Sequence, residues 1–293
     1  MYKRILVPLD ASTLSERVLP IAKHLARSLQ ASLELLLVVA PQAEEVPEEF
    51  SALAQQDAED YLQIRADALA KEIGSARLRY SVQLGHPASL IIEQAEAEPA
   101  TLVLMSSHGY SGVQRLLLGS VAGKVVQAAT TPVLLVPANA RSPEGDLVRF
   151  ERIIVPLDGS KLAECVLPHA SGLSRALGAE LILLRSYDPR FPGSTVRMHE
   201  VSKIVHDAAE NYIKAKAEEL KAEGLDRISY KIFRGMPAEQ IADFAIETAN
   251  SLTVMCTHGR QGIGRWMLGS VTNAVIHCSE EPVLVIRGVS EDS

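Results

Sequence analysis

The stretch YKRILVPLDAS (residues 2–12) returns in the second half of the chain as FERIIVPLDGS (residues 150–160), with seven of eleven positions identical at an offset of 148. A second stretch, HGYSGVQRLLLGSV (residues 108–121), returns as HGRQGIGRWMLGSV (residues 258–271), with eight of fourteen positions identical at an offset of 150. Two matches in the same order, with two residues of slippage between them, indicate one domain present twice. A site in one half is therefore expected in the other half as well.

The length of the chain supports this division. Its 293 residues accommodate two domains of about 145 residues, a common size with room for a hydrophobic core. The segment PANARSPEGD (residues 137–146) is rich in Pro, Ala, Ser and charge, as is typical of a linker. We therefore predict a first domain over residues 1–137, a linker over 138–149, a second domain over 150–288 and a tail over 289–293.

The charge distribution argues against nucleic acid and anionic membranes as the main partners. The chain has 13 basic and 17 acidic residues through Arg149 and 16 and 19 afterwards, so the halves carry −4 and −3. No apolar run reaches the roughly 18 residues of a membrane span, and the N-terminus lacks the apolar core of a signal peptide. Cys165, Cys256 and Cys278 form no obvious disulfide framework. These observations predict a reduced, soluble, cytoplasmic protein.

Strand-like and helix-like segments alternate along each half. In the first half we expect strands at residues 4–9, 32–39, 78–84, 101–105 and 132–136, and helices at 14–30, 50–73, 88–97 and 120–129. In the second half we expect strands near residues 152–157, 180–186, 228–234, 252–256 and 283–287, with helices between them. The segment SLELLLVV (residues 32–39) is nearly continuous Leu and Val, which is typical of a strand covered on both faces. The alternation predicts an α/β fold with a parallel sheet and helices on both faces.

The loop after the fourth strand of each half has the composition of a phosphate site. Gly109 follows the strand, and Gly119 and Ser120 open the next helix; Gly259, Gly269 and Ser270 match them in the second half. Glycine lacks a β-carbon and permits positive φ, so backbone N–H groups can approach a phosphate, and a helix N-terminus adds unpaired N–H groups and a positive dipole end. The alternative is an ordinary turn with Ser120 and Ser270 as N-caps. The repetition in both halves favours the phosphate site.

Asp10 and Asp158 end the first strand of each half. If that strand lies beside the fourth, each aspartate faces the glycine loop across the topological switch point. A carboxylate there can accept hydrogen bonds from ribose hydroxyls. The alternative role is to cap the helix that begins near Ser12; Ser12 and Ser160 are the other candidates for that cap.

Together these residues resemble the universal stress proteins. The motifs that carry the resemblance are VPLDAS and VPLDGS, the Gly-x-Pro motifs at residues 85–87 and 235–237, and HG-x9-GSV followed by PVLLV or PVLVI. They cover both halves nearly end to end, and their order is specific. The resemblance implies two tandem Rossmann-like domains of the adenine-nucleotide alpha-hydrolase-like class, each a five-stranded parallel sheet with helices on both faces.

The resemblance also implies binding of ATP, or of ADP or AMP, with Mg²⁺ as the accompanying cation. The family motif is G-x2-G-x9-G-[ST], its strand-one aspartate contacts ribose, and the backbone at the end of the second strand (residues 38–39 and 186–187) would lie against adenine. Carried over position by position, the site comprises Asp10, Val39, Ser106, His108, Gly109, Gly112, Gly119, Ser120 and Val121, and in the second half Asp158, Cys256, His258, Gly259, Gly262, Gly269, Ser270 and Val271. Ser106 and Cys256 stand where the family has its first motif glycine. Both are small, but an approach that needs a bare backbone or positive φ is weaker there.

Other features point less clearly to chemistry. His108 and His258 are candidate general bases, but the sequence assigns them no acidic partner, so structural histidines are the better interpretation. Arg115 and Arg265 recur in register and either reach a phosphate or are solvated. The pair Cys256 and His258 is too small a ligand set for zinc, and neither a P-loop nor a nucleophile elbow is present. We therefore assign no catalytic and no metal-binding residue.

Three functions remain open at this point. The leading hypothesis is a stress-response protein that binds ATP or a related adenine nucleotide, with one site in each domain, and acts as a regulatory module. The others are a slow ATPase or nucleotide-dependent hydrolase, and a scaffold that binds no nucleotide. Fold alone does not choose among them, and the regulatory protein partner cannot be read from the sequence.

The last strand of each half predicts how the domains associate. PVLLV (residues 132–136) and PVLVI (residues 282–286) are apolar, and the resemblance places this strand at a sheet edge. An exposed apolar edge favours pairing, and a linker of roughly ten residues raises the effective concentration of the two copies to the millimolar range. We predict an intramolecular pseudo-dimer joined through these strands. A homodimer of the whole chain is compatible with it but not required.

Overall fold

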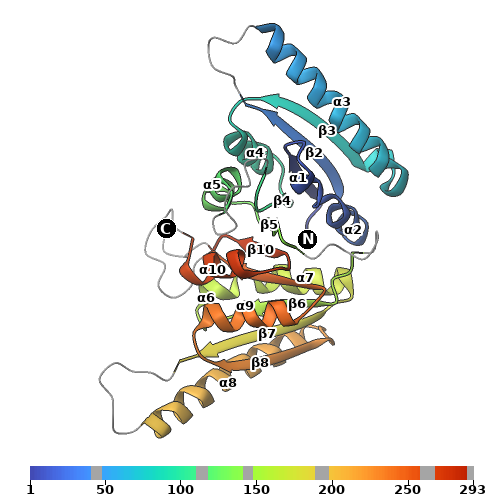
Figure 1. Cartoon of the computed structure of the whole chain (residues 1–293). Helices are drawn as coiled ribbons and strands as arrows, with labels where there is room; N and C mark the ends of the chain where they lie inside the picture. The colour runs from blue at the N-terminus through green and yellow to red at the C-terminus, as the bar shows by residue number, and fades with distance from the viewer. Residues whose placement is uncertain (41–47, 110–117, 141–147, 189–197, 258–267, 289–293) are drawn as a thin grey trace. The chain divides into compact units, whose positions relative to one another are not determined.

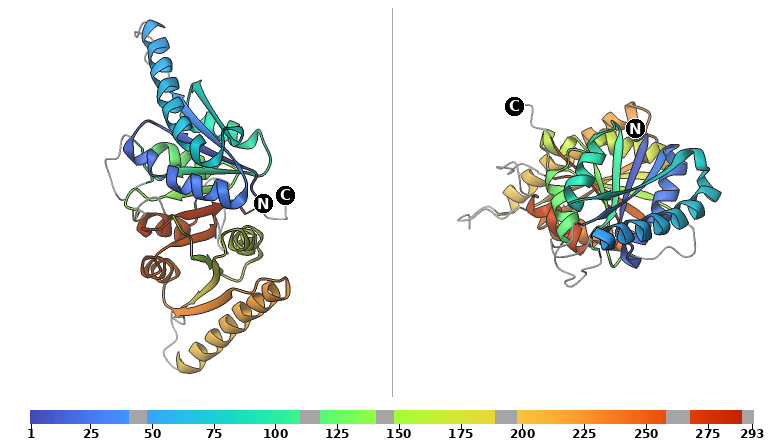
Figure 2. Two further views of the ribbon diagram at one scale, coloured as in Figure 1. Left: turned by 90° about the vertical axis from the view of Figure 1, so that its right-hand side faces the viewer. Right: turned by 90° about the horizontal axis from the view of Figure 1, so that it is seen from above.

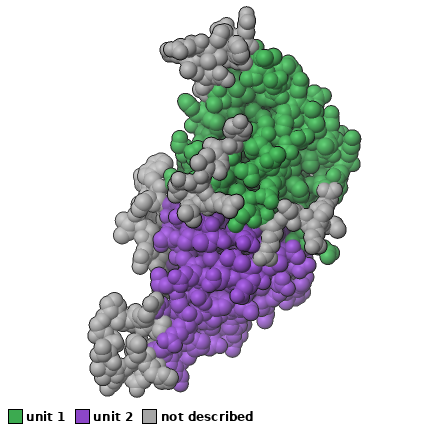
Figure 3. All heavy atoms as spheres, viewed as in Figure 1, with its two compact units in different colours: residues 1–149 green, residues 150–293 purple. Residues whose placement is uncertain are grey.

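The computed structural model describes residues 1–40, 48–109, 118–140, 148–188, 198–257 and 268–288 (Figure 1). The chain divides into two compact units, Met1–Arg149 and Phe150–Ser293, which are coloured separately in Figure 3. Each unit is described by itself below as unit 1 and unit 2.

Unit 1 alternates strands and helices. Its strands are β1 (Arg4–Leu9), β2 (Ser32–Val39), β3 (Leu78–Leu84), β4 (Thr101–Ser106) and β5 (Val133–Val136). Its helices are α1 (Thr13–Glu16), α2 (Leu19–Leu29), α3 (Glu48–Ile73), α4 (Pro87–Glu96) and α5 (Ser120–Ala128), with a 3-10 turn η1 (Ser75–Arg77). Within the unit the strand order is β3-β2-β1-β4-β5, and the pairings are parallel.

Unit 2 repeats this arrangement. Its strands are β6 (Arg152–Pro156), β7 (Glu180–Tyr187), β8 (Ile228–Arg234), β9 (Ser251–Cys256) and β10 (Val283–Ile286). Its helices are α6 (Lys161–Glu164), α7 (Leu167–Leu177), α8 (Met198–Ala222), α9 (Pro237–Glu247) and α10 (Ser270–Cys278). Within the unit the strand order is β8-β7-β6-β9-β10, again with parallel pairings. The expected α/β fold with five parallel strands in each half is confirmed.

The central strands are apolar because both sheet faces are covered. In unit 1, α2 and α3 pack on one face and α4 and α5 on the other (Figures 1 and 2). Every residue of β1, β4 and β5 is buried, whereas the outer strand β3 is mostly half-buried or exposed. Continuous burial of this kind is what a parallel sheet between two helical layers requires. None of the helices that the structure describes is long and apolar enough to cross a membrane.

The single helix expected over residues 14–30 is wrong. The structure has two helices there, α1 and α2, and α2 carries a proline in its first turn. Pro20 has no N–H to donate, and its ring would clash with the carbonyl four residues earlier if one helix ran through. Pro168 has the same place in unit 2, where α6 and α7 are likewise separate.

Strand order sets the position of the site. β1 pairs with β2 on one side and with β4 on the other, and all three run in the same direction. The chain therefore leaves β1 and β4 at the same edge of the sheet, on opposite sides of the point where the strand order reverses. In α/β sheets this crevice is the usual place for a ligand.

Candidate functional site

The end of β1 and the loop after β4 come into contact in unit 1. Asp10 directly follows β1, and Gly109 lies three residues beyond β4. A β-carbon built on Gly109 would overlap Oδ2 of Asp10, so only glycine allows this approach without displacing the carboxylate. Neither Gly109 nor Gly119 has a positive φ. The sequence-based rationale of positive φ is therefore wrong for these two glycines, and close approach takes its place.

The other oxygen of Asp10 organises the turn into α1. Its Oδ1 accepts hydrogen bonds from the backbone N–H of Ser12 at 3.1 Å and from the Ser12 hydroxyl at 2.6 Å. Ser12 in turn is the N-cap of α1 and accepts from the N–H of Ser15 at 3.1 Å. Asp10 is thus not the cap itself: it orients the cap with one oxygen and directs the other toward the glycine loop.

Unit 2 reproduces this turn. Asp158 Oδ1 accepts from the N–H of Ser160 at 2.9 Å and from its hydroxyl at 2.6 Å, and Ser160 caps α6 by accepting from the N–H of Ala163. The intervening residue has positive φ in both units, 61° at Ala11 and 82° at Gly159. A left-handed alanine costs energy and persists only where its surroundings hold it, a situation that is common at binding sites.

The loop after β4 closes on itself through the backbone. The N–H of Gly119 donates to the carbonyl of Ser107 at 2.9 Å, and in unit 2 the N–H of Gly269 donates to the carbonyl of Thr257 at 2.7 Å. A β-carbon on Gly119 would lie 3.0 Å from that Ser107 oxygen and 3.3 Å from the Cα of His108. This glycine is required because two backbone segments meet there.

The helix that follows begins with a glycine cap. Gly119 is the N-cap of α5 and Gly269 that of α10, and neither position provides a side-chain hydrogen bond. Ser120 and Ser270 are the first helical residues and are exposed, so the alternative interpretation of these serines as N-caps is wrong. The first turn of a helix has N–H groups without intrahelical acceptors, and such groups can bind an anion.

The residues around this loop differ between the units. In unit 1, Ser106 is the buried last residue of β4, and Ser107 Oγ lies 3.0 Å from Nδ1 of His108. Ser107 Oγ also accepts from the N–H of Ala138 at 3.2 Å. This bonding gives His108 a structural role in holding the loop. In unit 2, Cys256 takes the place of Ser106, and its carbonyl accepts from Thr272 Oγ1 at 2.7 Å. Val121 and Val271 are half-buried in the first turns of α5 and α10.

The Gly-x-Pro motifs hold the carboxyl end of the second strand. The N–H of Gly85 donates to the carbonyl of Val39 at 3.0 Å, and the N–H of Gly235 donates to the carbonyl of Tyr187 at 2.9 Å. Gly85 and Gly235 have φ of 152° and 143°, a region that disfavours side chains, and a proline then starts the next helix. Val39, expected near adenine, is the last residue of β2 and pairs with Leu84 of β3.

Several predicted site residues lie outside the described residues. These are Gly112, His258, Gly259 and Gly262, together with Arg115 and Arg265. Of the remaining predicted residues, Asp10 and Gly109 lie against each other in unit 1. The others lie at the carboxyl ends of strands or at the start of α5 and α10.

A polar cluster that was not predicted from the sequence recurs in both units. Glu16 Oε1 accepts from Tyr61 Oη at 2.9 Å and from Arg65 at 2.8 Å. In unit 2, Glu164 accepts from Tyr212 Oη at 2.8 Å and pairs with Lys216 at 3.0 Å. Burial, followed by the hydrogen bond to the carboxylate, raises the pKa of Tyr61 and of Tyr212. These bonds tie the long helix to the helical turn after the aspartate. Each glutamate is 45 or more residues away in the sequence from the side chains that bond it, so only an internal comparison of the repeats could have found the cluster.

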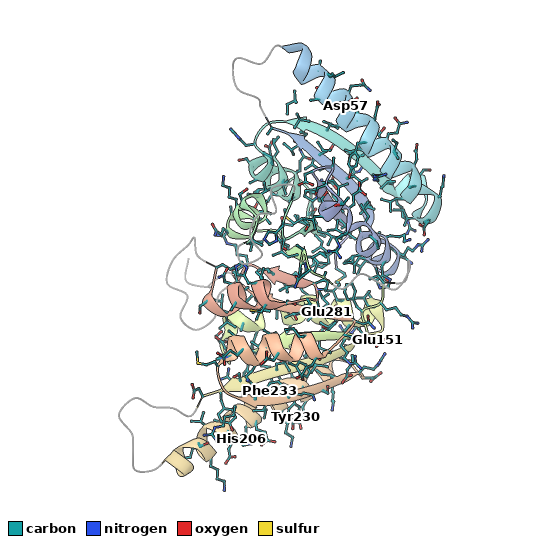
Figure 4. The ribbon with its side chains drawn as sticks, viewed as in Figure 1. Asp57, Glu151, His206, Tyr230, Phe233 and Glu281 are labelled. Carbon is teal, nitrogen blue, oxygen red and sulfur yellow. The ribbon has the colours of Figure 1, made fainter. Side chains whose placement is uncertain are left out.

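A histidine with two acidic neighbours occurs on α8. Among the described residues, His206, Asp207 and Glu210 form the one cluster whose donor atoms lie close enough together for a metal ion. Figure 4 shows His206 on α8, and its ring lies 5.3 Å from that of Tyr187. His206 and Glu210 are 41% and 45% exposed and form an (i, i+4) pair at 3.6 Å. Such a solvated helical pair is common without a metal, and no metal site is assigned.

The comparisons with known proteins identify the family. The model of the universal stress protein family matches residues 1–137 and again residues 149–287. The chain belongs to the universal stress protein family. The two matches correspond to the two copies of the repeated motifs, so this is a tandem member.

Relatives of similar length support this membership. A universal stress protein of Mycobacterium tuberculosis is 27% identical over 243 residues, which cover 80% of this chain and 78% of that protein. One from Mycolicibacterium smegmatis is 24% identical over 297 residues and covers 97% of this chain and 96% of that protein. The crystal structure of a universal stress protein from Archaeoglobus fulgidus has a TM-score of 0.72 at 23% identity and covers 98% and 99% of the two chains, which shows the shared fold.

Proposed function

We propose that each domain binds an adenine nucleotide, with ATP as the first candidate, and that the protein acts as a nucleotide-responsive regulatory module. The observation that carries the proposal is the paired arrangement at the strand ends. Asp10 and Asp158 follow the first strands, β1 and β6, while Gly119 and Gly269 are the N-caps of α5 and α10. The aspartate offers a carboxylate to ribose, and the N-terminus of the helix offers backbone N–H groups to phosphate.

The residues present fit such a ligand. The Asp10 carboxylate leaves no room for a side chain at Gly109, and the backbone of Ser107 and His108 leaves little room for one at Gly119. The N-terminal turn of α5 receives no side-chain hydrogen bond from its cap, so its N–H groups suit an anion. Ser120 is exposed beside them and can donate to a phosphate oxygen. Mg²⁺, where it accompanies ATP, would be held chiefly by the phosphates and water.

Nothing in the described part of the site favours turnover over binding. The one histidine of the site that the structure describes, His108, is bonded to Ser107 and supports the loop. We therefore place ATP hydrolysis, at most slow, behind binding as a function. Pairing of the two domains through residues 132–136 and 282–286 belongs to the same proposal, because apolar strands of this kind favour burial.

Nucleotide carried through purification tests the proposal. The full chain, purified without added nucleotide and denatured, should release adenine nucleotide that mass spectrometry identifies, and the protein should rebind it. A chain that neither releases nor binds any adenine nucleotide would favour the scaffold function. Turnover that is lost in a folded Gly119→Val, Gly269→Val double variant would favour the hydrolase.

A further inference from the structure

Two cysteines meet beside the candidate site of unit 2. Cys165 is the C-cap of α6, and Cys256 is the last residue of β9, 91 positions later. Their sulfur atoms lie 3.7 Å apart, and the Cys165 thiol donates a hydrogen bond to the Cys256 sulfur. Both are thiols, as is Cys278. The two cysteines bring the end of α6, which follows Asp158, into contact with the end of β9, which precedes the glycine loop.

The backbone just after β10 lies close to the Cys256 sulfur at Gly288. A β-carbon on Gly288 would lie 2.7 Å from Cys256 Sγ and 2.8 Å from Leu162 Cγ, so a side chain here would press on the sulfur. Glycine at position 288 therefore leaves room for the Cys256 sulfur.

Unit 1 has different chemistry at the same place. The positions that match Cys165 and Cys256 in the repeat are Arg17 and Ser106. Arg17 donates hydrogen bonds to the carbonyls of Ala138 and Ala140, which lie just beyond β5. In unit 1 an arginine therefore bonds the backbone just beyond β5, whereas unit 2 has two thiols in contact at the matching positions. The two candidate sites differ in whether they can respond to oxidation.

We propose that Cys165 and Cys256 are a redox modification site that forms a reversible disulfide and lowers nucleotide affinity in unit 2 alone. The inference that the bond forms rests on the geometry of the pair and is independent of the proposed function. Its effect on affinity rests on the proposed function.

A peroxide is the oxidant that we propose. One cysteine, as the thiolate, attacks a peroxide oxygen; the O–O bond breaks, hydroxide leaves, and a sulfenic acid remains. The sulfur of the second cysteine then attacks the sulfenic sulfur, an S–S bond forms and water leaves. For hydrogen peroxide the sum is two thiols and one H₂O₂ giving one disulfide and two waters. A small dithiol reverses the bond by exchange and is itself oxidised.

The geometry sets both the rate and the effect. The hydrogen bond to Cys256, and then burial, raise the pKa of Cys165, so thiolate is scarce near neutral pH and the bond should form faster as pH rises. The sulfurs must approach by about 1.7 Å, from 3.7 Å to the disulfide length of about 2.05 Å. Cys256 and Thr257 accept the hydrogen bonds that hold Thr272 and Gly269, so this movement shifts the opening of α10 relative to Asp158.

Peptide mapping tests the bond itself. The full chain is treated with hydrogen peroxide, alkylated and digested, and we expect a linked peptide pair containing Cys165 and Cys256 that disappears after dithiothreitol. The exposed Cys278 is the internal control and should be recovered as the alkylated or overoxidised form. The Cys165→Ser and Cys256→Ser variants, checked for folding by circular dichroism, should each lose the link. Recovery of Cys165 and Cys256 unlinked, or linked to Cys278 at equal yield, would overturn the proposal.

Calorimetry tests the effect on binding. ATP is titrated into the reduced and oxidised Gly119→Val variant, in which unit 2 supplies the remaining site. We expect oxidation to lower its affinity by at least about threefold, and the same treatment to leave affinity unchanged when Cys165→Ser is added. Equal affinity of both redox forms would overturn the regulatory part. Absence of nucleotide binding in the reduced wild-type protein would refute the proposed function instead, since the mapping result stands independently of it.

Discussion

The carboxylate of Asp10 lies against the backbone of Gly109, so closely that a β-carbon on Gly109 would overlap Oδ2. The two residues belong to loops that follow different strands, β1 and β4, and adjacency of these strands brings them together. The same carboxylate holds Ser12 through its other oxygen. The position of the Asp10 carboxylate thus depends on the absence of a side chain at Gly109.

Replacing Gly109 with Ala should therefore damage the site by moving Asp10. We expect nucleotide affinity of unit 1 to fall about tenfold, or ~1.4 kcal/mol, measured by calorimetry in a Gly269→Val background. Because the two residues act through one contact, the effects of Gly109→Ala and Asp10→Gly should be non-additive in a double-mutant cycle. Additive effects would show that the contact does not matter for binding.

Replacing Gly119 and Gly269 with Val should push each helix N-terminus away from the backbone that follows β4 or β9. The added side chain meets the Ser107 carbonyl in unit 1, and ATP affinity should fall at least about tenfold while the fold survives. Gly123→Ala is the matched control, since a β-carbon there makes an ordinary contact of 3.8 Å with Leu118, which precedes α5. That variant should bind normally and be slightly more stable. Unchanged affinity in the folded double Val variant would refute the phosphate assignment.

Replacing Asp10 and Asp158 with Ala should weaken ATP and adenosine together, because the lost contact is to ribose. A 2′,3′-dideoxy analogue should bind the wild type and the variants with similar affinity. Ser12→Ala is the control for the capping role: it should cost about 1 kcal/mol of stability through the lost N-cap bond and leave adenosine affinity nearly unchanged. An equally large loss with the dideoxy analogue would mean that the aspartates act only by shaping the turn.

Acid should destabilise unit 1 partly through His24. Burial, followed by repulsion from Arg149 and Arg27, lowers the pKa of His24 below its ordinary value of 6.5. The unfolded chain then binds the proton more readily, so the contribution of neutral His24 is full above pH 6.5 and is lost as pH falls toward the folded-state pKa. In urea unfolding at pH 7.5 and 5.5, the His24→Gln variant should lose less stability than the wild type. Identical losses would exclude His24 as a contributor.

Pairing of the two domains through residues 132–136 and 282–286 stays a prediction. Small-angle scattering of the full chain should give one compact particle, because the linker keeps the two copies at high effective concentration. A distance distribution with two separated maxima would contradict it, as would two domains that tumble independently in NMR relaxation.

Much of the fold could be predicted from the apolar strands. Strands over residues 4–9 and 32–39 have the predicted bounds, because a parallel sheet covered on both faces requires continuous apolar runs between polar loops. The outer strand over residues 78–84 has the predicted bounds as well, although each of its residues is half-buried or exposed. The break between α1 and α2 was missed although Pro20 marks it, because apolar residues at helical spacing continue across the break. The 3-10 turn at Ser75–Arg77 carries no apolar period and was missed as well.

The site was harder to predict because its contacts cross the sequence. The sequence predicts that Asp10 faces the glycine loop, provided that the first and fourth strands are assumed to be neighbours, as they are. That Gly119 needs its glycine for close approach rather than for positive φ could not be read from residue types, since glycine serves both needs. The thiol pair of Cys165 and Cys256 and the cluster around Glu16 depend on side-chain directions at residues far apart in the chain.

Titration calorimetry of ATP into the nucleotide-free full chain is the decisive test of nucleotide binding. We expect saturable binding with two sites per chain, one site in each of the Gly119→Val and Gly269→Val single variants, and none measurable over the same concentration range in the double variant. No binding of ATP, ADP or AMP by the folded wild-type protein, or binding unaffected in the folded double variant, would contradict it.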